Sequence, residues 1–352
     1  MFKFVLSALM SLMIAVAPIQ VSANVTQKPS ATKLKKASVK KAGVKKQRVS
    51  RTKARVAKRG ARQKIVISNG RRQIYARNFA PAAPRYIAPS VGERAGLHLT
   101  PDPLELRSNV AFVIDQNNLQ VLFEKNANIS LPIASITKLM TGLIVVQAGQ
   151  DLNEMLTVSQ DDVDTHKFTR SRLAVGSRMS RADLLHISLM SSENRAAAAL
   201  GRNYPGGIQG FVATMNAKAH ELGMTETHYV DSSGLSSKNV ASARDLAKLA
   251  LAAYKEPLLR QYSTDPNSTV AAGGRVINYR NTNYLVALPD WEIGLQKTGF
   301  INEAGRCLVM QAMVQGRAVI MVFLDAKGKQ SRTADAGRVR RWLEGMNPIG
   351  IM

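Results

Sequence analysis

The sequence predicts a mixed α/β fold, in which a central antiparallel sheet is built from strands at both ends of the folded segment and is flanked by a mostly helical region. Three observations support this prediction. Strand-like apolar runs separated by turns lie after residue 108 and again after residue 290. Helical spacing of apolar residues dominates between them. Apolar residues make up 45% of the 352, so the chain can bury a sizeable core.

The first 23 residues have the pattern of a secretory signal peptide. Lys3 precedes a mostly apolar run from Val5 to Pro18, and 21–23 places small residues where a signal peptidase cleaves. The apolar run is short for a membrane span, and a retained N-terminal anchor is the alternative interpretation. Export through this signal predicts a location in the periplasm or cell envelope.

Residues 24–85 form a basic low-complexity segment. They hold twenty Lys or Arg and no Asp or Glu, whereas residues 86–352 are close to electrical balance. Because like charges repel and little apolar mass is available, the segment is predicted to be disordered, with 64–68 as one short extended piece. After export its partner would be an anionic envelope surface rather than nucleic acid. A solvated spacer without a partner is the alternative.

The folded domain, 86–352, is predicted to open with a hairpin and a buried helix. Asn109–Asp115 and Leu119–Glu124 are strand-like runs around the turn 116–118. Behind Ser135, apolar residues follow the i, i+3, i+4, i+7, i+8 spacing of a buried stripe on a helix that ends near Gly149. This stripe consists of Ile136, Leu139, Met140, Leu143 and Ile144.

Helical patterns then fill the middle of the domain, after a polar stretch at 159–166 that predicts a loop and a short helix. They lie at Ala182–Met190, Arg195–Leu200, Phe211–Leu222 and Ala241–Tyr254. Ser242, with Asp245 three residues later, is the expected cap of the last of these helices.

The last third of the chain returns to strands. The expected elements are a strand at Trp291–Gly299, a hairpin of Cys307–Val314 with Ala318–Leu324, and a closing helix at Thr333–Met346. Cys307 is the one cysteine in the sequence, so no intrachain disulfide is possible. Its apolar neighbours predict a buried strand residue.

Ser135 and Lys138 carry the main chemical hypothesis. The spacing S-x-x-K occurs four times, at Ser30, Ser38, Ser50 and Ser135. The first three copies lie in the Lys-rich segment, where composition alone predicts them. Only Ser135 begins a core-packed helix, on which a spacing of three puts both side chains on one face. A lysine amine that is held neutral can act as the base for a serine nucleophile.

Two more short motifs follow in the folded domain. Ser192-Glu193-Asn194 lies at a junction between two predicted helices, and Lys297-Thr298-Gly299 lies in a predicted strand. Gly299 has no side chain, so a substrate backbone can approach the strand there. Taken singly, each motif has an ordinary structural explanation as a cap, a loop pair or a strand turn. Their order and their contexts together make the combination specific.

With these three motifs, residues 86–350 resemble the penicillin-binding proteins and serine β-lactamases, in which S-x-x-K, S-x-N and K-T-G line one cleft. Stretches at 189–196, 234–236 with 243–247, and 297–300 are similar to the low-molecular-mass DD-peptidases, and those at 280–283 and 325–329 to the endopeptidase branch of penicillin-binding protein 7 type. The resemblance implies a β-lactamase/transpeptidase-like fold with the active site between the sheet and the helical region.

The resemblance also implies a role for each motif residue. Ser135 attacks a D-alanyl peptide bond, Lys138 takes the serine proton, and Ser192 relays it to the leaving amine. The implied substrate-binding residues are Asn194, Lys297, Thr298, Gly299 and Phe300. Among these, the Phe300 backbone N–H joins that of Ser135 in an oxyanion hole. Burial and the charge of Lys297 are expected to lower the pKa of Lys138.

The activity that this resemblance favours is a serine D-alanyl-D-alanine endopeptidase acting on peptidoglycan cross-links. The sequence after Ser135 lacks the Glu-x-x-Leu-Asn pattern of common β-lactamases, so β-lactams are expected to be covalent inhibitors. The alternatives are a carboxypeptidase that removes terminal D-Ala and a non-catalytic protein that binds polyanions or the cell wall. No cofactor is implied, and the five histidines lack the H-E-x-x-H spacing of a metal site.

Overall fold

The computed structural model describes residues 64–68, 71–75 and 88–346; the predicted signal peptide and most of the basic segment lie outside these ranges. In the basic segment, β1 (Lys64–Ser68) and β2 (Arg71–Tyr75) pair antiparallel. The extended piece expected from the sequence is thus a strand, and its partner β2 was not predicted. These two strands belong to one compact unit, and the residues from 88 onward belong to another.

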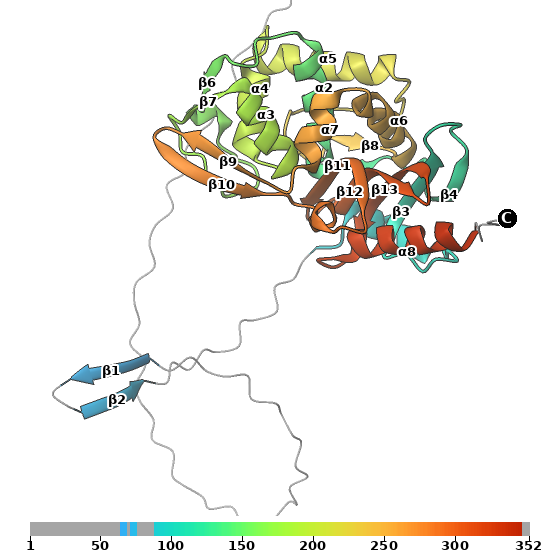
Figure 1. Cartoon of the computed structure of the whole chain (residues 1–352), viewed down its shortest axis with the longest axis horizontal. Helices are drawn as coiled ribbons and strands as arrows, with labels where there is room; N and C mark the ends of the chain where they lie inside the picture. Colours follow the sequence, from blue (N-terminus) through green and yellow to red (C-terminus); the bar gives the residue numbers. More distant parts are fainter. Residues whose placement is uncertain (1–63, 69–70, 76–87, 347–352) are drawn as a thin grey trace, which may run out of the picture. The chain divides into compact units, whose positions relative to one another are not determined.

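The second unit contains the predicted antiparallel sheet (Figure 1). Its strands lie in the order β11 (Glu292–Ile301), β12 (Gly305–Val314), β13 (Arg317–Ala326), β3 (Ser108–Asp115) and β4 (Val121–Lys125). The N-terminal hairpin joins the C-terminal strands where Met321 of β13 lies opposite Val113 of β3. This arrangement leaves β11, which carries Lys297-Thr298-Gly299, at one edge of the sheet.

The two faces of the sheet are covered by different helices, because successive residues of a strand point to opposite faces. In β13, Ile320 and Val322 belong to the core beneath the helical region, whereas Met321 and Phe323 belong to a second, smaller core. The second core is closed by α8 (Ser331–Met346), the predicted closing helix. Figure 1 shows α8 on the opposite side of the sheet from α6 (Ala243–Tyr254).

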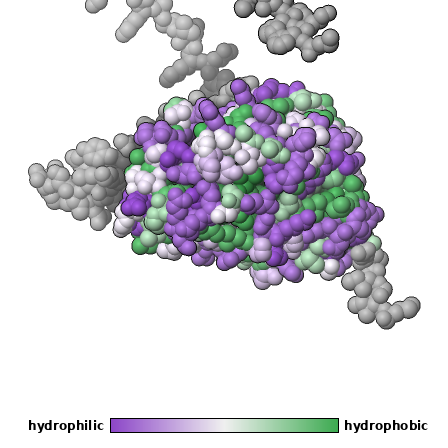
Figure 2. Space-filling model, turned by 90° about the horizontal axis from the view of Figure 1, so that it is seen from above, coloured by the Kyte–Doolittle hydropathy of each residue, from purple (hydrophilic) through white to green (hydrophobic). Residues whose placement is uncertain are grey.

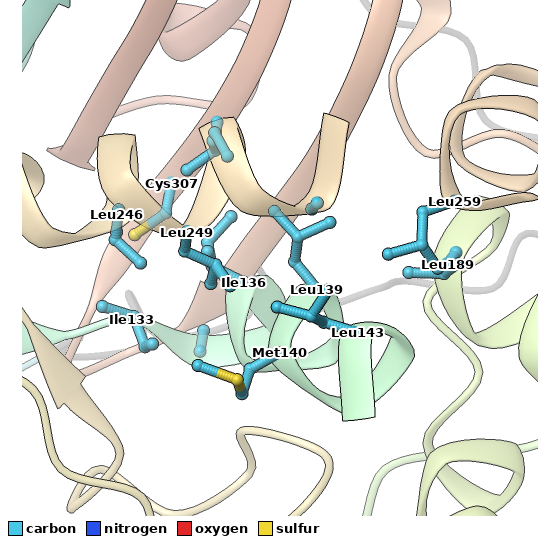
Figure 3. Packing of buried hydrophobic residues seen from close by; sticks show 14 of the residues in the cluster. Ile133, Ile136, Leu139, Met140, Leu143, Leu189, Leu246, Leu249, Leu259 and Cys307 are labelled. Carbon is cyan, nitrogen blue, oxygen red and sulfur yellow. The ribbon is translucent and has the colours of Figure 1, made fainter. Parts of the chain in front are cut away.

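The central helix of the large core is α2 (Thr137–Gln147), which is buried from Thr137 through Val145. A helix that is buried on all sides must be surrounded by other elements rather than by solvent. Figure 3 shows Ile136, Leu139 and Leu143 lying among Leu246 and Leu249 of α6 on one side and the Leu189–Leu259 pair on the other. The predicted apolar stripe is therefore confirmed, and it holds the start of α2 rigidly.

The other predicted helices are present, with small shifts in their ends. They are α3 (Arg181–Met190), α4 (Asn194–Arg202), α5 (Gly207–Glu221), and the short 3-10 turn η3 (Gln160–Asp162). The expected cap of α6 is confirmed, since the Ser242 side chain accepts a hydrogen bond from the Asp245 N–H. Ser180 caps α3 in the same way.

Two larger segments were missed by the sequence-based prediction, besides the short elements given below. They are α7 (Pro257–Thr264) and the hairpin of β9 (Asn267–Ala272) with β10 (Arg275–Arg280). Both are rich in polar residues and bury few apolar side chains, so their apolar periodicity is weak. The remaining short elements are α1 (Val91–Arg94), η1 (Leu97–Leu99), η2 (Ala134–Ile136), η4 (Tyr284–Ala287), and the strand pairs β5 (Leu131–Pro132) with β8 (Val240–Ala241) and β6 (Met155–Thr157) with β7 (Arg178–Ser180).

The face of the second unit shown in Figure 2 is largely hydrophilic, with smaller separate apolar patches. Within the ranges that the structure describes, no helix combines the length and the apolar character needed to cross a membrane.

Candidate active site

Ser135 lies in the 3-10 turn η2, directly before α2. The regular helix therefore begins two residues later than the sequence predicted. Ala134 has a φ of 48°, a left-handed conformation that is strained for alanine and is often found at functional sites. The Thr137 hydroxyl, which receives a hydrogen bond of 3.0 Å from Asn239, donates one of 2.8 Å to the Ala134 carbonyl. These bonds stabilise the strained turn that presents the serine.

Gly234 packs directly against the same turn. Its φ of 80° lies in the region that favours glycine, and a Cβ atom at this position would collide with the Ala134 carbonyl oxygen. The loop that contains Gly234 is thus pressed against the backbone beside Ser135. This close approach brings the carbonyl of Ser233 within reach of the next residue of the motif, Lys138.

The Lys138 side chain is fully buried and its Nζ atom has three hydrogen-bond partners. It donates to Ser135 Oγ at 2.9 Å, to Asn194 Oδ1 at 2.8 Å and to the Ser233 carbonyl at 2.6 Å. Burial lowers the pKa of Lys138 to about 7, against the opposing effect of the Asp231 and Glu193 carboxylates. A substantial fraction of this amine is therefore neutral near pH 7.

Burial lowers the pKa of Lys138, as expected, and the repulsion between Lys138 and Lys297 is found at Lys297. Burial and the charges of Lys138 and Arg332 hold the pKa of Lys297 well below its ordinary value. Two ammonium groups in one buried site repel each other, so they compete for protonation.

Lys297 is fully buried on β11 and lacks a carboxylate partner among the described residues. Its Nζ atom donates a hydrogen bond of 3.0 Å to the Thr298 carbonyl. The Thr298 hydroxyl lies 2.6 Å from the Thr282 hydroxyl. The backbone N–H of Thr282 donates a hydrogen bond to the Met190 carbonyl. A carboxylate that binds beside this amine favours its protonated form and pairs with it. Lys297 and Thr298 therefore offer a site suited to a carboxylate.

β11 passes very close to Ser135. A Cβ atom on Gly299 would lie 2.7 Å from the Ile133 carbonyl oxygen and 3.3 Å from Ser135 N, so only glycine fits at this crossing. This contact explains the glycine of the K-T-G motif through packing of the protein itself, in addition to the predicted access for substrate.

The backbone amide of Phe300 lies on the open edge of β11. The Gln296 N–H points away from β12 and donates to Ser263 Oγ at 3.3 Å. Because the backbone direction alternates with a period of two, the N–H groups of Thr298 and Phe300 point to the same edge. Ser135 N lies at the Gly299 crossing, and Phe300 is the next residue of β11, so the pairing of these two amides in an oxyanion hole stays a prediction.

The Ser192-Glu193-Asn194 motif lies at the junction of α3 and α4, as predicted, and Asn194 is the first residue of α4. Asn194 is bonded to Lys138 and donates through Nδ2 to the Thr169 hydroxyl at 3.0 Å. Ser192 has a φ of 62°, a left-handed conformation that turns the chain sharply before Glu193 caps α4. Within the described residues its hydroxyl has no hydrogen bond to Ser135 or Lys138, so its relay role stays a prediction.

The structure thus brings together a serine and a buried amine of low pKa, and it places the strand that carries Lys297 and Gly299 beside them. This combination can activate a hydroxyl, stabilise an oxyanion and bind a carboxylate, which together suit acyl transfer. A cluster of three or more side chains able to hold a metal ion is not found in the described ranges.

Comparison with known proteins gives the family. The family model described as D-alanyl-D-alanine carboxypeptidase matches residues 98–328, more than half of the chain. The chain belongs to this family. It is therefore a serine DD-peptidase by family, as the resemblance of its three motifs predicted.

Two curated relatives of this DD-peptidase are D-alanyl-D-alanine endopeptidases. The protein from Pseudomonas aeruginosa is 48% identical over 260 residues, which are 73% of this chain and 83% of the relative. The protein from Escherichia coli is 42% identical over 259 residues, or 73% of this chain and 84% of the relative. The crystal structure of the Streptomyces K15 DD-transpeptidase matches with a TM-score of 0.64 at 25% identity, covering 70% of this chain and 99% of that one. The predicted fold class is confirmed.

Several groups in the site of this DD-peptidase were missed by sequence reasoning. The Asp231 carboxylate accepts bonds from the N–H groups of Ser233, Gly234 and Ser236, and it thereby shapes the loop whose carbonyl holds Lys138. The run from Asp231 to Ser236 reads as a turn, which is a usable signal for the loop. The sequence does not indicate that the Ser233 carbonyl accepts a hydrogen bond from Lys138, because every residue has the same backbone carbonyl. Thr169 is a second missed partner.

Proposed function

We propose that this DD-peptidase is a D-alanyl-D-alanine endopeptidase that hydrolyses peptide cross-links of peptidoglycan through an acyl-enzyme on Ser135. The observation that carries the proposal is the 2.9 Å hydrogen bond between Ser135 Oγ and the fully buried Lys138, whose pKa is about 7. The names of the relatives from Pseudomonas aeruginosa and Escherichia coli support the endopeptidase assignment.

Acylation begins when Ser135 Oγ attacks the carbonyl carbon of the scissile D-alanyl bond. The hydroxyl proton moves to the neutral Nζ of Lys138, which is already within hydrogen-bond distance. The carbonyl oxygen becomes an oxyanion and accepts hydrogen bonds from the N–H groups of Ser135 and Phe300. Loss of one such donor in comparable sites costs about 3 to 4 kcal/mol of transition-state stabilisation.

The tetrahedral intermediate then collapses and the C–N bond breaks. The leaving amine takes the proton from Lys138, with Ser192 as the proposed relay. Asn194 keeps Lys138 in place through its Oδ1 atom. A carboxylate on the leaving group provides the counter-charge that the buried Lys297 lacks, and Thr298 adds a hydroxyl beside it.

Deacylation requires a water molecule to attack the Ser135 ester, with Lys138 again as the base. Water adds its hydroxyl to the acyl carbon, and its proton returns to the serine oxygen. A β-lactam acylates the same serine by opening its ring. Because its leaving amine stays attached to the acyl group, it is expected to remain as a covalent inhibitor.

The test uses purified cross-linked muropeptide dimers and reads the product masses. The proposal expects monomers from dimers with the wild-type protein and none with Ser135→Ala. A fluorescent penicillin should label the wild type covalently and leave Ser135→Ala unlabelled. Equal labelling of both proteins would refute Ser135 as the nucleophile.

A carboxypeptidase that removes terminal D-Ala is the second candidate, since the family description names that activity. The two activities share the acyl donor and differ in the leaving group. Release of free D-Ala from a monomeric pentapeptide muropeptide, without cleavage of dimers, would favour the carboxypeptidase. The third alternative, a non-catalytic protein that binds polyanions, predicts no covalent labelling by penicillin.

We further propose that the protein is exported through residues 1–23 and that the basic segment 24–85 contacts an anionic surface of the envelope. The charge of this segment supports the second part, since twenty Lys or Arg occur there without any Asp or Glu. Sedimentation of the segment with purified cell wall or anionic vesicles, at low and high salt, tests it. No binding at low salt would refute the contact.

A further inference from the structure

The loop between η3 and β7 is a feature that the proposed mechanism does not use. Its centre is the Asp164 carboxylate, which accepts hydrogen bonds from the N–H groups of His166, Lys167 and Thr169 at 2.8 to 2.9 Å. It also accepts one from the Thr169 hydroxyl at 2.7 Å. Burial alone would raise the pKa of Asp164, but these bonds outweigh it and lower the pKa. The loop therefore has a defined conformation.

This loop joins the catalytic centre to the far end of β11. On one side, the Thr169 hydroxyl accepts a bond of 3.0 Å from Asn194, the residue that holds Lys138. On the other side, Lys167 Nζ lies 2.5 Å from the Glu303 carboxylate, in the turn that follows β11. Lys167 and Thr169, which flank Phe168, thus contact two different parts of the fold, the turn after β11 and the start of α4.

Phe168 lies between these two anchors. Its side chain is 80% exposed, and its φ is 52°, in the left-handed region that a bulky residue rarely adopts. An aromatic side chain that a strained backbone holds in solvent does not contribute to the stability of the hydrophobic core. Both neighbours are bonded, so Phe168 is held at this position beside Asn194 and Glu303.

The order of groups along β11 gives the direction of a bound substrate. Lys297 lies at the carboxylate end, Phe300 supplies the oxyanion amide, and Glu303 follows three residues later. Because β11 ends at Ile301 and Glu303 lies in the turn that joins it to β12, the Lys167–Glu303 pair lies past the end of the strand, on the Phe300 side. In a peptide extended along this edge, the leaving group lies toward Lys297. The acyl-donor stem then runs toward Glu303 and Phe168.

We propose that Phe168, together with the Lys167–Glu303 ion pair, forms a clamp that binds the acyl-donor stem peptide. Phe168 packs on the aliphatic part of a stem side chain, and the ion pair closes the end of the cleft over the peptide. This inference rests on the proposed function for the direction in which the substrate lies. The clamp residues determine affinity for an extended peptide and take no part in bond cleavage.

The Lys167–Glu303 ion pair is partly exposed to solvent, as expected of a contact that can open when substrate binds. The two side chains are 30% and 33% exposed, and pairs of that kind contribute little stability. A branched peptide can therefore displace the pair at small cost. The far end of the loop is anchored separately, since the Arg172 guanidinium stacks 3.8 Å from the Tyr279 ring centroid. Loss of the Phe168 side chain should leave the fold intact.

The experiment compares Phe168→Ala with the wild type on three acyl donors: a cross-linked muropeptide dimer, a monomeric pentapeptide muropeptide and a fluorescent penicillin. Leu119→Ala is the matched control, because Leu119 is also an exposed apolar residue with a left-handed φ, in the β3–β4 turn at the opposite edge of the sheet. We expect Phe168→Ala to raise the KM for both peptides roughly tenfold, with kcat little changed. Penicillin acylation and the control should stay at the wild-type level.

Glu303→Gln provides a second measurement, because it removes the charge and keeps the shape. It should raise the KM for both peptides about threefold, and the salt dependence of this KM should become weaker than in the wild type. Equal losses on penicillin and on the peptides would show that the loop merely supports the catalytic centre. Unchanged KM values for both peptides would also overturn the clamp.

The two muropeptides separate this inference from the proposed function. A wild-type protein that trims the pentapeptide but leaves dimers intact would refute the endopeptidase assignment. The clamp would still be tested on the pentapeptide, which has the same acyl-donor stem. A wild-type protein that reacts with penicillin but with neither peptide would refute both proposals.

Discussion

Lys138 Nζ lies 2.9 Å from Ser135 Oγ, and it is held there by two further acceptors, Asn194 Oδ1 and the Ser233 carbonyl. This relationship sets the requirements of the proposed chemistry. The amine must be neutral to accept a proton, and it must stay beside the serine while it does so. Burial provides the first condition, and the loop of Ser233 provides the second.

The rate of acylation by a fluorescent penicillin should rise with pH. The base is the neutral form of Lys138, whose pKa burial lowers to about 7. Below this pH the amine is protonated and acylation is slow; above it the rate levels off. The second-order rate constant measured between pH 5.5 and 8.5 checks this. A flat profile over that range would show that Lys138 is not the base.

Replacement of Lys138 by Met should lower the acylation rate constant by about 10³-fold, because it removes general-base catalysis. Thermal stability should change little, since replacing a fully buried amine by an apolar side chain of similar length offsets the loss of its hydrogen bonds to Asn194 and Ser233. Penicillin labelling quenched at successive times measures the acylation rate constant, and calorimetry measures the thermal stability. If the variant is unfolded, its loss of activity does not show that Lys138 is the general base, and the prediction is contradicted.

Asp231→Ala should lower both stability and acylation. The Asp231 carboxylate holds three backbone N–H groups of the loop that presents the Ser233 carbonyl to Lys138. Loss of hydrogen bonds to a charged acceptor costs about 1.5 to 3 kcal/mol of unfolding free energy. Urea unfolding and penicillin acylation test this together. Asp231→Asn, which keeps part of the acceptor capacity, should lie between the wild type and Asp231→Ala.

Gly299→Ala should disturb the crossing of β11 over the Ser135 turn. The added Cβ would lie 2.7 Å from the Ile133 carbonyl oxygen, a backbone atom that cannot move freely. We expect a loss of about 1 to 3 kcal/mol in stability and slower acylation, because the two oxyanion amides move apart.

Gly345→Ala is the matched control for Gly299→Ala. A Cβ at Gly345 of α8 meets nothing within 4 Å, and alanine is favoured in a helix by about 1 kcal/mol. This variant should be as stable as the wild type or more so, with normal acylation. Unaltered acylation in Gly299→Ala, measured beside this control, would contradict the close crossing.

Much of the fold is predictable from the sequence because apolar spacing is a direct consequence of burial. The stripe from Ile136 to Ile144 predicts α2, and the runs that contain Val113 and Met321 predict strands that meet in one sheet. Segments that bury little apolar surface, such as α7 and the β9–β10 hairpin, give no comparable pattern. Their positions depend on contacts with distant elements.

The same division applies to the site. Ser135, Lys138 and Asn194 were predicted, and the structure brings them together through side-chain hydrogen bonds. The Ser233 carbonyl and the Thr169 hydroxyl were not predicted. A backbone carbonyl is the same in every residue, and the role of a threonine hydroxyl depends on which groups lie next to it in the folded protein. The sequence therefore identifies neither group. Burial of Lys138 was expected to lower its pKa and does so, and the repulsion between this amine and Lys297 is found on the pKa of Lys297.

The pairing of β3 with β13 has a consequence for how the chain acquires its structure. Arg317 at the start of β13 bonds Asp115 at the end of β3 across a separation of 202 residues. Contacts between such distant segments require a large loss of chain entropy before they form, and they slow folding. The sheet therefore cannot be completed until nearly all of the helical region has been synthesised.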